Sequence, residues 1–457
     1  ATLWWLNWFD GRSESAFAQW RGLCQGRDVN ALVTAGQLIN WGMPTLAAEM
    51  LNALDCQRTL PLYLQASLLP KAERGELVAK AIDVFPQFVR FPNTLEEVAA
   101  LESIEECWFA RHLLACFYYN KRSYNKAITL WQRCVEMSPE FADGWRGLAI
   151  HAWNKQHDYE LAARYLDNAY QLAPQDARLL FERDLLDKLS GTTPEKRLAR
   201  LENNLEIALK RDDMTAELLN LWHLTGQADK AADILATRKF HPWEGGEGKI
   251  TSQFILNQLL RAWQHLDARE PQQASELLHA ALHYPENLSE GRLPGQTDND
   301  IWFWQAVCAN AQGDETEATR CLRLAATGDR TINIHSYYND QPVDYLFWQG
   351  MALRLLGEQH TAQQLFSEMK QWAKEMAKTS IEADFFAVSQ PDLLSLYSDL
   401  QQQHKEKCLM VAMLASAGLG EAAHYESARA ELTAINPAWP KAALFTTVMP
   451  FIFNRVH

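Results

Sequence analysis

Two consecutive segments of the chain repeat one another: residues 108–139 read WFARHLLACFYYNKRSYNKAITLWQRCVEMSP, and residues 143–174 read DGWRGLAIHAWNKQHDYELAARYLDNAYQLAP. In both, apolar residues are spaced by three and four, which predicts two α-helices joined by a short turn. The matching positions lie 35 residues apart, and they are Ala127 and Ala162, Trp131 and Leu166, Cys134 and Ala169, and Pro139 and Pro174. The two segments therefore encode a repeated helix hairpin.

Weaker copies of this hairpin run along the rest of the chain. Most share a Gly, an Ala five residues later and a bulky residue four further on; these are Gly42, Ala47 and Leu51, then Gly226, Ala231 and Leu235, then Gly313, Ala318 and Leu322, and finally Gly357, Ala362 and Phe366. The Gly is expected to end the first helix, where the backbone needs left-handed geometry. The Ala lets two helices cross closely, and the bulky residue fills the space to the next pair.

This pattern resembles the tetratricopeptide repeat, with small residues where helices touch, large ones between them and a closing proline. The resemblance implies an all-α, right-handed superhelical solenoid of about ten antiparallel helix pairs. A generic helical repeat is the alternative. We divide the expected array into residues 1–105, where the repeats are degenerate, and residues 106–457, where they are clearer.

Composition narrows the classes of partner. The formal net charge is −14 and no basic stripe offsets it, which argues against nucleic acid and anionic membranes. No run of 18 apolar residues predicts a membrane span. The eight cysteines form no CxxC pair, and no signal peptide is visible, which fits a reduced, cytoplasmic compartment. The chain starts at Ala1 within an apolar run, so we interpret it as part of a larger polypeptide.

Three long connections interrupt the array, at residues 237–249, 285–297 and 327–341. Each follows the second helix of one pair and precedes the first helix of the next. Since all such junctions of a stacked array lie on one edge, the three loops are expected side by side, and insertions on one edge often form the binding face. The alternative is that the loops fold back and seal the array.

The residue types in these loops suit recognition. Aromatic rings offer flat apolar faces, carboxylates and amides offer hydrogen bonds, and histidine or arginine adds donors. The candidate binding residues are His241, Trp243, Glu244, Glu247, Asn287, Glu290, Arg292, Tyr337, Tyr338, Asn339 and Asp340.

The loop segments 241–248, 285–291 and 338–342 also resemble the C-terminal tetratricopeptide half of large bacterial proteins linked with sugar metabolism. Those proteins carry an N-terminal β-sandwich domain similar to galactose mutarotase. The resemblance covers roughly residues 105–370 and implies that the loops dock this upstream domain or form one wall of its site. It supplies no catalytic residue to carry over.

Motifs for chemistry are weak. His279 and His283 share one helix face, but no Glu stands between them as in an HExxH zinc site, so no metal is expected. There is no GxSxG, P-loop or dinucleotide fingerprint, so we expect no cofactor and no enzyme. Glu244 and Glu290 would serve glycoside hydrolysis only if a cleft held them together.

Three functions remain open at this stage. The leading hypothesis is an interaction scaffold that binds a protein partner or the upstream domain of the same polypeptide. The second is a carbohydrate-binding or carbohydrate-processing unit that uses the loop aromatics and carboxylates. The third is a peptide-binding, chaperone-type module with Arg111 and Lys121, then Arg146 and Asn154, on successive first helices, although their spacing differs between repeats.

Overall fold

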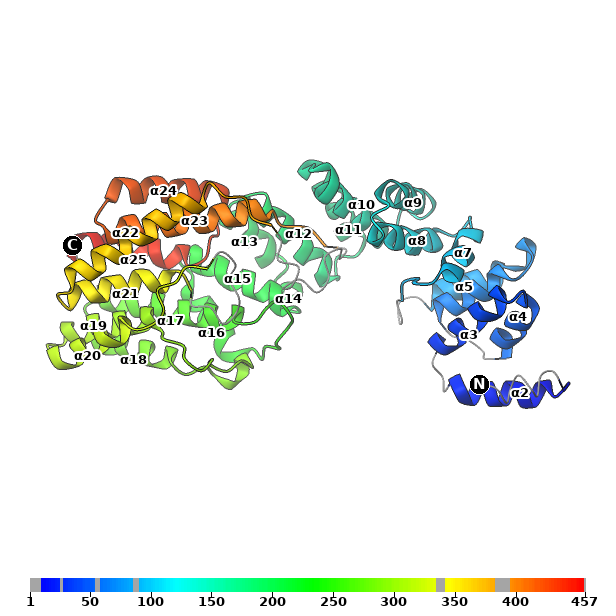
Figure 1. The fold of residues 1–457 in the computed structure, drawn as a ribbon, viewed down its shortest axis with the longest axis horizontal. Coiled ribbons are helices and arrows are strands. Elements are labelled where there is room, and N and C mark those ends of the chain that lie inside the picture. Colours follow the sequence, from blue (N-terminus) through cyan, green and yellow to red (C-terminus); the bar gives the residue numbers. More distant parts are fainter. Residues whose placement is uncertain are drawn as a thin grey trace. The chain divides into compact units, whose positions relative to one another are not determined.

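The structure is a computed structural model that describes residues 10–24, 28–53, 58–84, 90–333, 342–382 and 395–455. Across these ranges it is helical and contains no β-strand (Figure 1). Within the same ranges, no helix is long and apolar enough to cross a membrane. The all-α prediction is confirmed.

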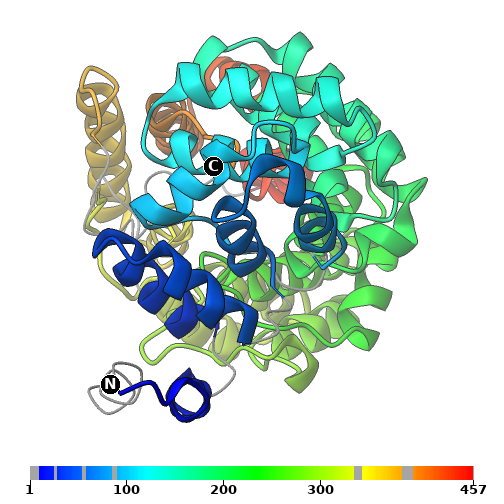
Figure 2. The same cartoon turned by 90° about the vertical axis from the view of Figure 1, so that its right-hand side faces the viewer.

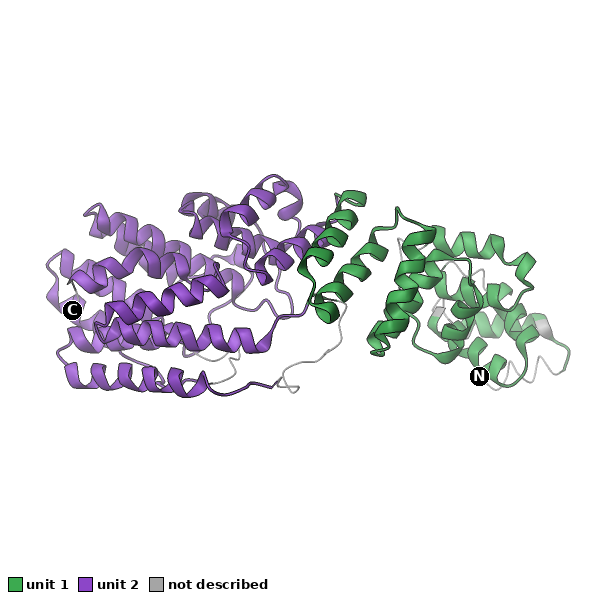
Figure 3. Ribbon diagram, turned by 90° about the horizontal axis from the view of Figure 1, so that it is seen from above, with its two compact units in different colours: residues 1–174, 390–396 green, residues 175–389, 397–457 purple. Residues whose placement is uncertain are grey.

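The chain divides into two compact units (Figure 3). Unit 1 comprises residues 1–174 and 390–396, and unit 2 comprises residues 175–389 and 397–457. The sequence-based division at residue 105 concerned the quality of the repeats, and it stays a prediction.

Most helices of unit 1 form pairs of neighbours in the chain, and α2 and α7 stand outside these pairs (Figures 1 and 2). The pairs are α3–α4, α5–α6, α8–α9 and α10–α11. The helices of this unit are α2 (Ser13–Cys24), α3 (Asp28–Asn40), α4 (Pro44–Ala53), α5 (Thr59–Ser67), α6 (Gly75–Asp83), α7 (Leu95–Ser103), α8 (Trp108–Asn120), α9 (Tyr124–Met137), α10 (Ala142–His151) and α11 (Tyr159–Leu172), with a 3-10 turn η1 (Lys71–Glu73) and a π-helical segment η3 (Ala152–Gln156).

Unit 2 continues the same construction. Its pairs are α12–α13, α15–α16, α17–α18, α19–α20, α21–α22 and α23–α24, so the described residues form ten pairs in all, as expected. The helices of this unit are α12 (Ala177–Leu189), α13 (Pro194–Glu202), α14 (Leu205–Ala208), α15 (Asp212–Leu224), α16 (Ala228–Thr237), α17 (Lys249–Asp267), α18 (Pro271–Ala281), α19 (Asn299–Ala311), α20 (Glu315–Ala325), α21 (Asp344–Leu355), α22 (Gln359–Met376), α23 (Leu400–Gly418), α24 (Ala422–Ile435) and α25 (Ala442–Arg455), with a 3-10 turn η4 (Glu286–Leu288).

Small residues lie where helices meet, as the repeat pattern predicts. The alanines at the repeat position are buried, and they are Ala127, Ala162, Ala231, Ala274, Ala318 and Ala362. The bulky residue that follows packs against glycine on a neighbouring helix. A Cβ at Gly147 would lie 2.3 Å from the Trp131 indole, and one at Gly350 would lie 2.3 Å from the Phe366 ring. Only glycine therefore permits these close helix contacts without displacing the ring.

A left-handed residue ends the first helix of most pairs. Gly42, Gly226, Gly313 and Gly357 all have φ between 74° and 87°, which confirms the predicted turn position. After it, a backbone N–H bonds to the carbonyl five residues back, as from Gln227 to Trp222 at 2.8 Å. This is the hydrogen-bond pattern of a Schellman motif.

Three pairs place a residue other than glycine at this turn, and these residues are Arg122, His157 and Arg269, with φ of 59°, 55° and 63°. Two of them belong to the clearest sequence repeats. An L-residue tolerates this conformation at a cost of roughly 1–2 kcal/mol. A search for glycine therefore misses these turns.

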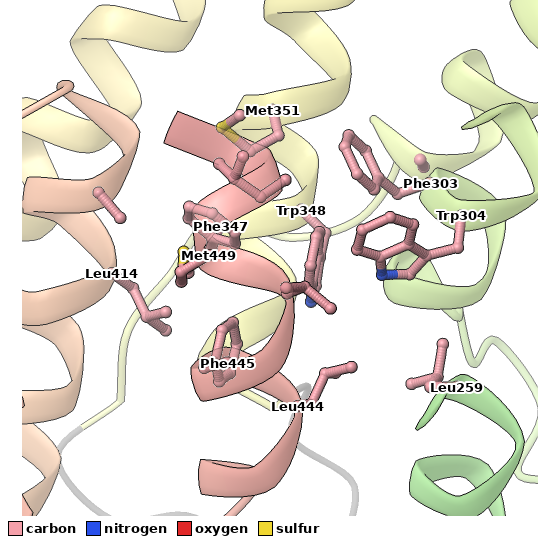
Figure 4. Close-up of a cluster of buried hydrophobic side chains, with 14 of the residues drawn as sticks. Leu259, Phe303, Trp304, Phe347, Trp348, Met351, Leu414, Leu444, Phe445 and Met449 are labelled. Carbon is pink, nitrogen blue, oxygen red and sulfur yellow. The ribbon is translucent and has the colours of Figure 1, made fainter. Parts of the chain in front are cut away.

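The helix α25 completes the core of unit 2. It lies across the first helices of successive pairs, where its Phe451 ring centroid is 5.3 Å from that of Trp263 and 5.9 Å from that of Trp304. Figure 4 shows its Leu444, Phe445 and Met449 among side chains of α17, α19 and α21. The opposite face of α25 is exposed and carries Thr446, Thr447, Pro450 and Asn454.

A buried ion cluster fixes the start of α25. The Lys441 ammonium lies 3.0 Å from a carboxylate oxygen of Asp300 and 2.5 Å from one of Asp344. These aspartates stand in the first turns of α19 and α21, so one cation joins three elements that are far apart in the chain. Both carboxylates are almost fully buried.

Candidate functional site

Two of the three long connections lie side by side in unit 2. Residues 238–248 join α16 to α17, and residues 282–298 join α18 to α19. The Phe240 N–H donates to the Asn287 carbonyl at 2.8 Å, and the Ser289 hydroxyl donates to the Phe240 carbonyl at 2.7 Å. The predicted adjacency of these two loops is confirmed, and we call them together the paired rim.

The side chain of Asn287 faces inward. Its amide nitrogen donates to the carbonyls of Leu235 at 2.8 Å and Arg238 at 2.7 Å, at the end of α16. Both amide hydrogens are thereby used to satisfy carbonyls that the helix leaves without partners. Asn287 thus joins one loop of the paired rim to the helix that precedes the other.

The third connection begins beside α19. Asn299 donates to the carbonyls of Ala325 and Thr327, both at 2.7 Å, in the same way that Asn287 caps α16. The candidates Tyr337, Tyr338, Asn339 and Asp340 lie outside the described residues. Their expected place next to the other two loops stays a prediction.

Glu290 and Arg292 also bind groups within the rim. A Glu290 oxygen accepts from the Gly248 N–H at 2.8 Å, immediately before α17, where a carboxylate interacts favourably with the helix dipole. Arg292 donates to the Leu282 carbonyl at 2.7 Å and forms an ion pair with the buried carboxylate of Asp298. These contacts stiffen the rim.

Other candidates present polar or aromatic groups to solvent. The His241 side chain is 71% exposed, and its backbone N–H and Nδ1 lie 3.0 and 3.3 Å from an Asp212 oxygen. Trp243 is half-buried and covers Gly246, where a Cβ would lie 1.9 Å from the indole. Glu244 and Glu247 are exposed. An indole edge, an imidazole and two carboxylates therefore occupy the outer side of the loop 238–248.

Sequence reasoning did not identify Asp212 and Phe240 as part of this site. Asp212 begins α15, and its carboxylate accepts from Arg238 at 2.6 Å as well as from His241. Phe240 is fully buried beneath the Arg238 guanidinium. An aspartate at a helix start signals a local cap, but no sequence pattern links it to a loop 26 residues later.

The histidines and cysteines of the described residues were the remaining candidates for metal binding or reactivity. No three His, Cys, Asp or Glu side chains converge there as metal ligands. The rings of His279 and His283 lie edge to face with centroids 5.5 Å apart. Burial raises the pKa of the Cys308 thiol to about 12, which disfavours the reactive thiolate.

No protein-family model matches the chain. Solved structures with some likeness to it include the Naa15/Naa10 complex bound to HypK-THB, which is 12% identical over 85% of this chain with a TM-score of 0.35. The chain spans 61% of the length of that structure.

Two further structures resemble the chain. The P58(IPK) TPR domain is 15% identical over 78% of this chain and 97% of its own, with a TM-score of 0.25. The APC/C hetero-tetramer Cut9-Hcn1 is 12% identical over 99% of this chain and 89% of its own, with a TM-score of 0.25. The fold assignment rests on the helix pairs and turns described above, not on these likenesses.

Proposed function

We propose that the chain is a non-catalytic interaction scaffold that binds a folded protein partner through the paired rim of unit 2. The observation that carries this proposal is the position of α25. In unit 2, the inner face of the first helices is where an extended or helical peptide would lie, and α25 already occupies it (Figure 4). A partner of unit 2 therefore has to meet an outer surface.

Helix α25 is bound firmly to this inner face of the first helices. Five α25 side chains are almost fully buried, and these are Leu444, Phe445, Val448, Met449 and Ile452. Burying each contributes roughly 1.5–3 kcal/mol, so removing the helix would cost on the order of the whole stability of a domain. Exchange of α25 for a peptide is not a practical binding mode.

The paired rim offers the features of a recognition surface. Asn287, Glu290 and Arg292 hold its backbone, so it is preorganised and loses little entropy on binding. The exposed His241 and half-buried Trp243 then supply an aromatic anchor with polar neighbours, which is the usual composition of a binding hot spot. The partner we favour is the sugar-handling domain that the loop resemblance implies.

Calorimetric titration of a separately produced mutarotase-like domain tests this function. The variant is Trp243→Ala combined with Glu247→Ala, and binding is expected to weaken at least about tenfold, as for a hot-spot residue. Trp41→Ala is the matched control, since Trp41 is 58% exposed but lies in unit 1. Equal affinity in the rim variant and the control would exclude the paired rim as the docking surface.

A second candidate is direct carbohydrate binding, which the half-buried Trp243 ring with the exposed Glu244 and Glu247 favours. Titration with a panel of mono- and disaccharides, followed by tryptophan fluorescence, distinguishes it from protein docking. A saturable change that disappears in Glu244→Ala/Glu247→Ala, which keeps the Trp243 reporter, would support the sugar-binding function. A flat response leaves the scaffold as the function of the rim.

A further inference from the structure

Two exposed histidines lie next to one another at the end of α18, at the edge of the paired rim. His279 stands in the last turn of the helix, and His283 follows its end, in the loop 282–298. Their ring centroids are 5.5 Å apart, and the ring planes make an angle of 66°. Two imidazoles that bind the same metal ion at about 2.1 Å have centroids about 5 Å apart. A small rotation of the side chains would therefore let the two rings share an ion.

Neither ring has a competing hydrogen bond within the residues that the structure describes. Other histidines of unit 2 are engaged in such bonds. His265 Nδ1 lies 2.7 Å from a Glu270 oxygen, and His404 Nε2 lies 2.9 Å from the Met376 carbonyl. A metal ion binds the lone pair of a neutral imidazole, which a hydrogen-bond donor would otherwise occupy. The pair at the end of α18 keeps its lone pairs for a ligand.

The position of the pair on the helix favours a cation. The C-terminal end of a helix carries a partial negative charge, which stabilises a positive charge in its last turn. The exposed carboxylate of Glu276 stands three residues before His279, on the same face of α18. The backbone here is ordered, because the Leu282 N–H bonds to the His279 carbonyl at 3.2 Å and the His283 N–H bonds to the Ala280 carbonyl at 3.0 Å. Both ligands thus start from a fixed backbone.

The prediction that no metal binds here excluded only a zinc site of the HExxH type, in which a glutamate between the histidines is the general base. Within the described residues, no third His, Cys, Asp or Glu converges on the pair. Water therefore has to fill the remaining coordination positions. A few nitrogen ligands completed by oxygen suit Cu²⁺ and Ni²⁺, which accept square-planar or tetragonal coordination.

We propose that His279 and His283 bind one divalent transition-metal ion, and that this ion clamps the end of α18. The site goes beyond the docking function proposed above and does not depend on it. Cu²⁺ binds more tightly than Ni²⁺ or Zn²⁺, in the usual order for nitrogen ligands. Mg²⁺ and Ca²⁺ do not bind, because they prefer oxygen ligands.

Calorimetric titration of the full chain with NiCl₂, in a buffer that does not chelate metals, tests the site. We expect saturable binding that weakens at least about tenfold in His279→Ala and in His283→Ala, since loss of a group that merely orients a metal ligand already costs 10–100-fold. His360→Ala is the matched control, because His360 is an exposed histidine of α22 in the same unit, and it should bind as the unmodified chain does. Acidification should release the metal, because the imidazoles must be neutral to bind it.

Hydrogen exchange provides the second measurement. Ni²⁺ should slow exchange severalfold at the Leu282 and His283 amides, whose hydrogen bonds lie within the clamped turn, and it should not do so in His279→Ala. Both histidines are exposed, so their alanine variants should keep the helix content of the unmodified chain. The absence of saturable binding to the unmodified chain overturns the proposal. Equal affinity in the two histidine variants does so as well, as does binding that leaves the two amides unchanged.

Discussion

The Trp131 indole lies directly on Gly147, so close that a Cβ at the glycine would stand 2.3 Å from the ring. The contact joins α9 of one pair to α10 of the next, and it brings the two helices together through the smallest residue available. The stacking of successive pairs in unit 1 therefore depends on the absence of a single methyl group.

Gly147→Ala is expected to destabilise unit 1 by about 1–3 kcal/mol, the usual cost of overpacking a core. Urea unfolding followed by tryptophan fluorescence measures the change. Gly22→Ala is the control, because Gly22 is exposed in α2 and an added Cβ would meet nothing within 4 Å. That control should be neutral or slightly stabilising, since alanine favours the helix. Equal effects at both glycines would contradict the packing argument.

Arg269→Gly is expected to stabilise the chain by about 1 kcal/mol, because Arg269 is exposed and has a φ of 63° that glycine adopts without strain. Gly226→Ala, at the same turn of the preceding pair, should destabilise by a similar amount. Thermal unfolding of both variants measures their melting temperatures, which should rise for Arg269→Gly and fall for Gly226→Ala. A melting temperature that falls for Arg269→Gly would mean that contacts of the arginine outweigh its backbone strain.

Asn287→Leu is expected to destabilise the paired rim by about 1–3 kcal/mol, since it leaves the carbonyls of Leu235 and Arg238 without their donor. Hydrogen exchange should speed up at the Phe240 amide, whose acceptor is the Asn287 carbonyl. Amides of unit 1 serve as the internal reference and should not change. Unaltered exchange at Phe240 would show that Asn287 does not hold the two loops together.

Lys441→Met is expected to cost about 3–5 kcal/mol near neutral pH, because it leaves two buried carboxylates without their counter-ion. Burial raises the pKa of Asp344, and the Lys441 ammonium opposes that rise. A carboxyl with a raised pKa in the folded chain stabilises the fold below its unfolded pKa and loses that contribution as pH rises through the folded value.

The deficit of Lys441→Met should therefore shrink as the pH falls, because the pKa of Asp344 is raised by burial and its freed carboxylate takes up a proton. Urea unfolding at a series of pH values measures this trend. Adding Asp300→Asn and Asp344→Asn should restore part of the stability at neutral pH, because the buried negative charge is removed. A deficit independent of pH would contradict the role of the ion cluster.

The helix pairs were predictable because each depends on residues close together in the chain. Ala127 and Ala162, 35 residues apart, mark positions where two helices cross closely. Gly226 marks a position where the backbone takes a left-handed turn. The turns at Arg122 and His157 could not be predicted, because only glycine marks a left-handed backbone conformation in the sequence. The cost of that angle is small enough for packing to override it.

The candidate site was predictable only in part. The adjacency of the loops at Phe240 and Asn287 follows from the order of the repeats, and it was expected. The Asn287 side chain points toward carbonyls about fifty residues earlier in the chain, so no local pattern shows that it faces inward. The position of α25 across α17, α19 and α21 likewise depends on contacts that no repeat period encodes.

The order of synthesis gives α25 a further importance. All the helices on which α25 packs come earlier in the chain. A nascent polypeptide therefore exposes Trp304 and Trp348 until residues 444–452 have left the ribosome. During that interval the aromatic surface is open to aggregation or to chaperones. A chain that ends at a premature stop codon before α25 would contain all the helix pairs described here. It would nevertheless aggregate or be degraded, because its aromatic surface stays exposed.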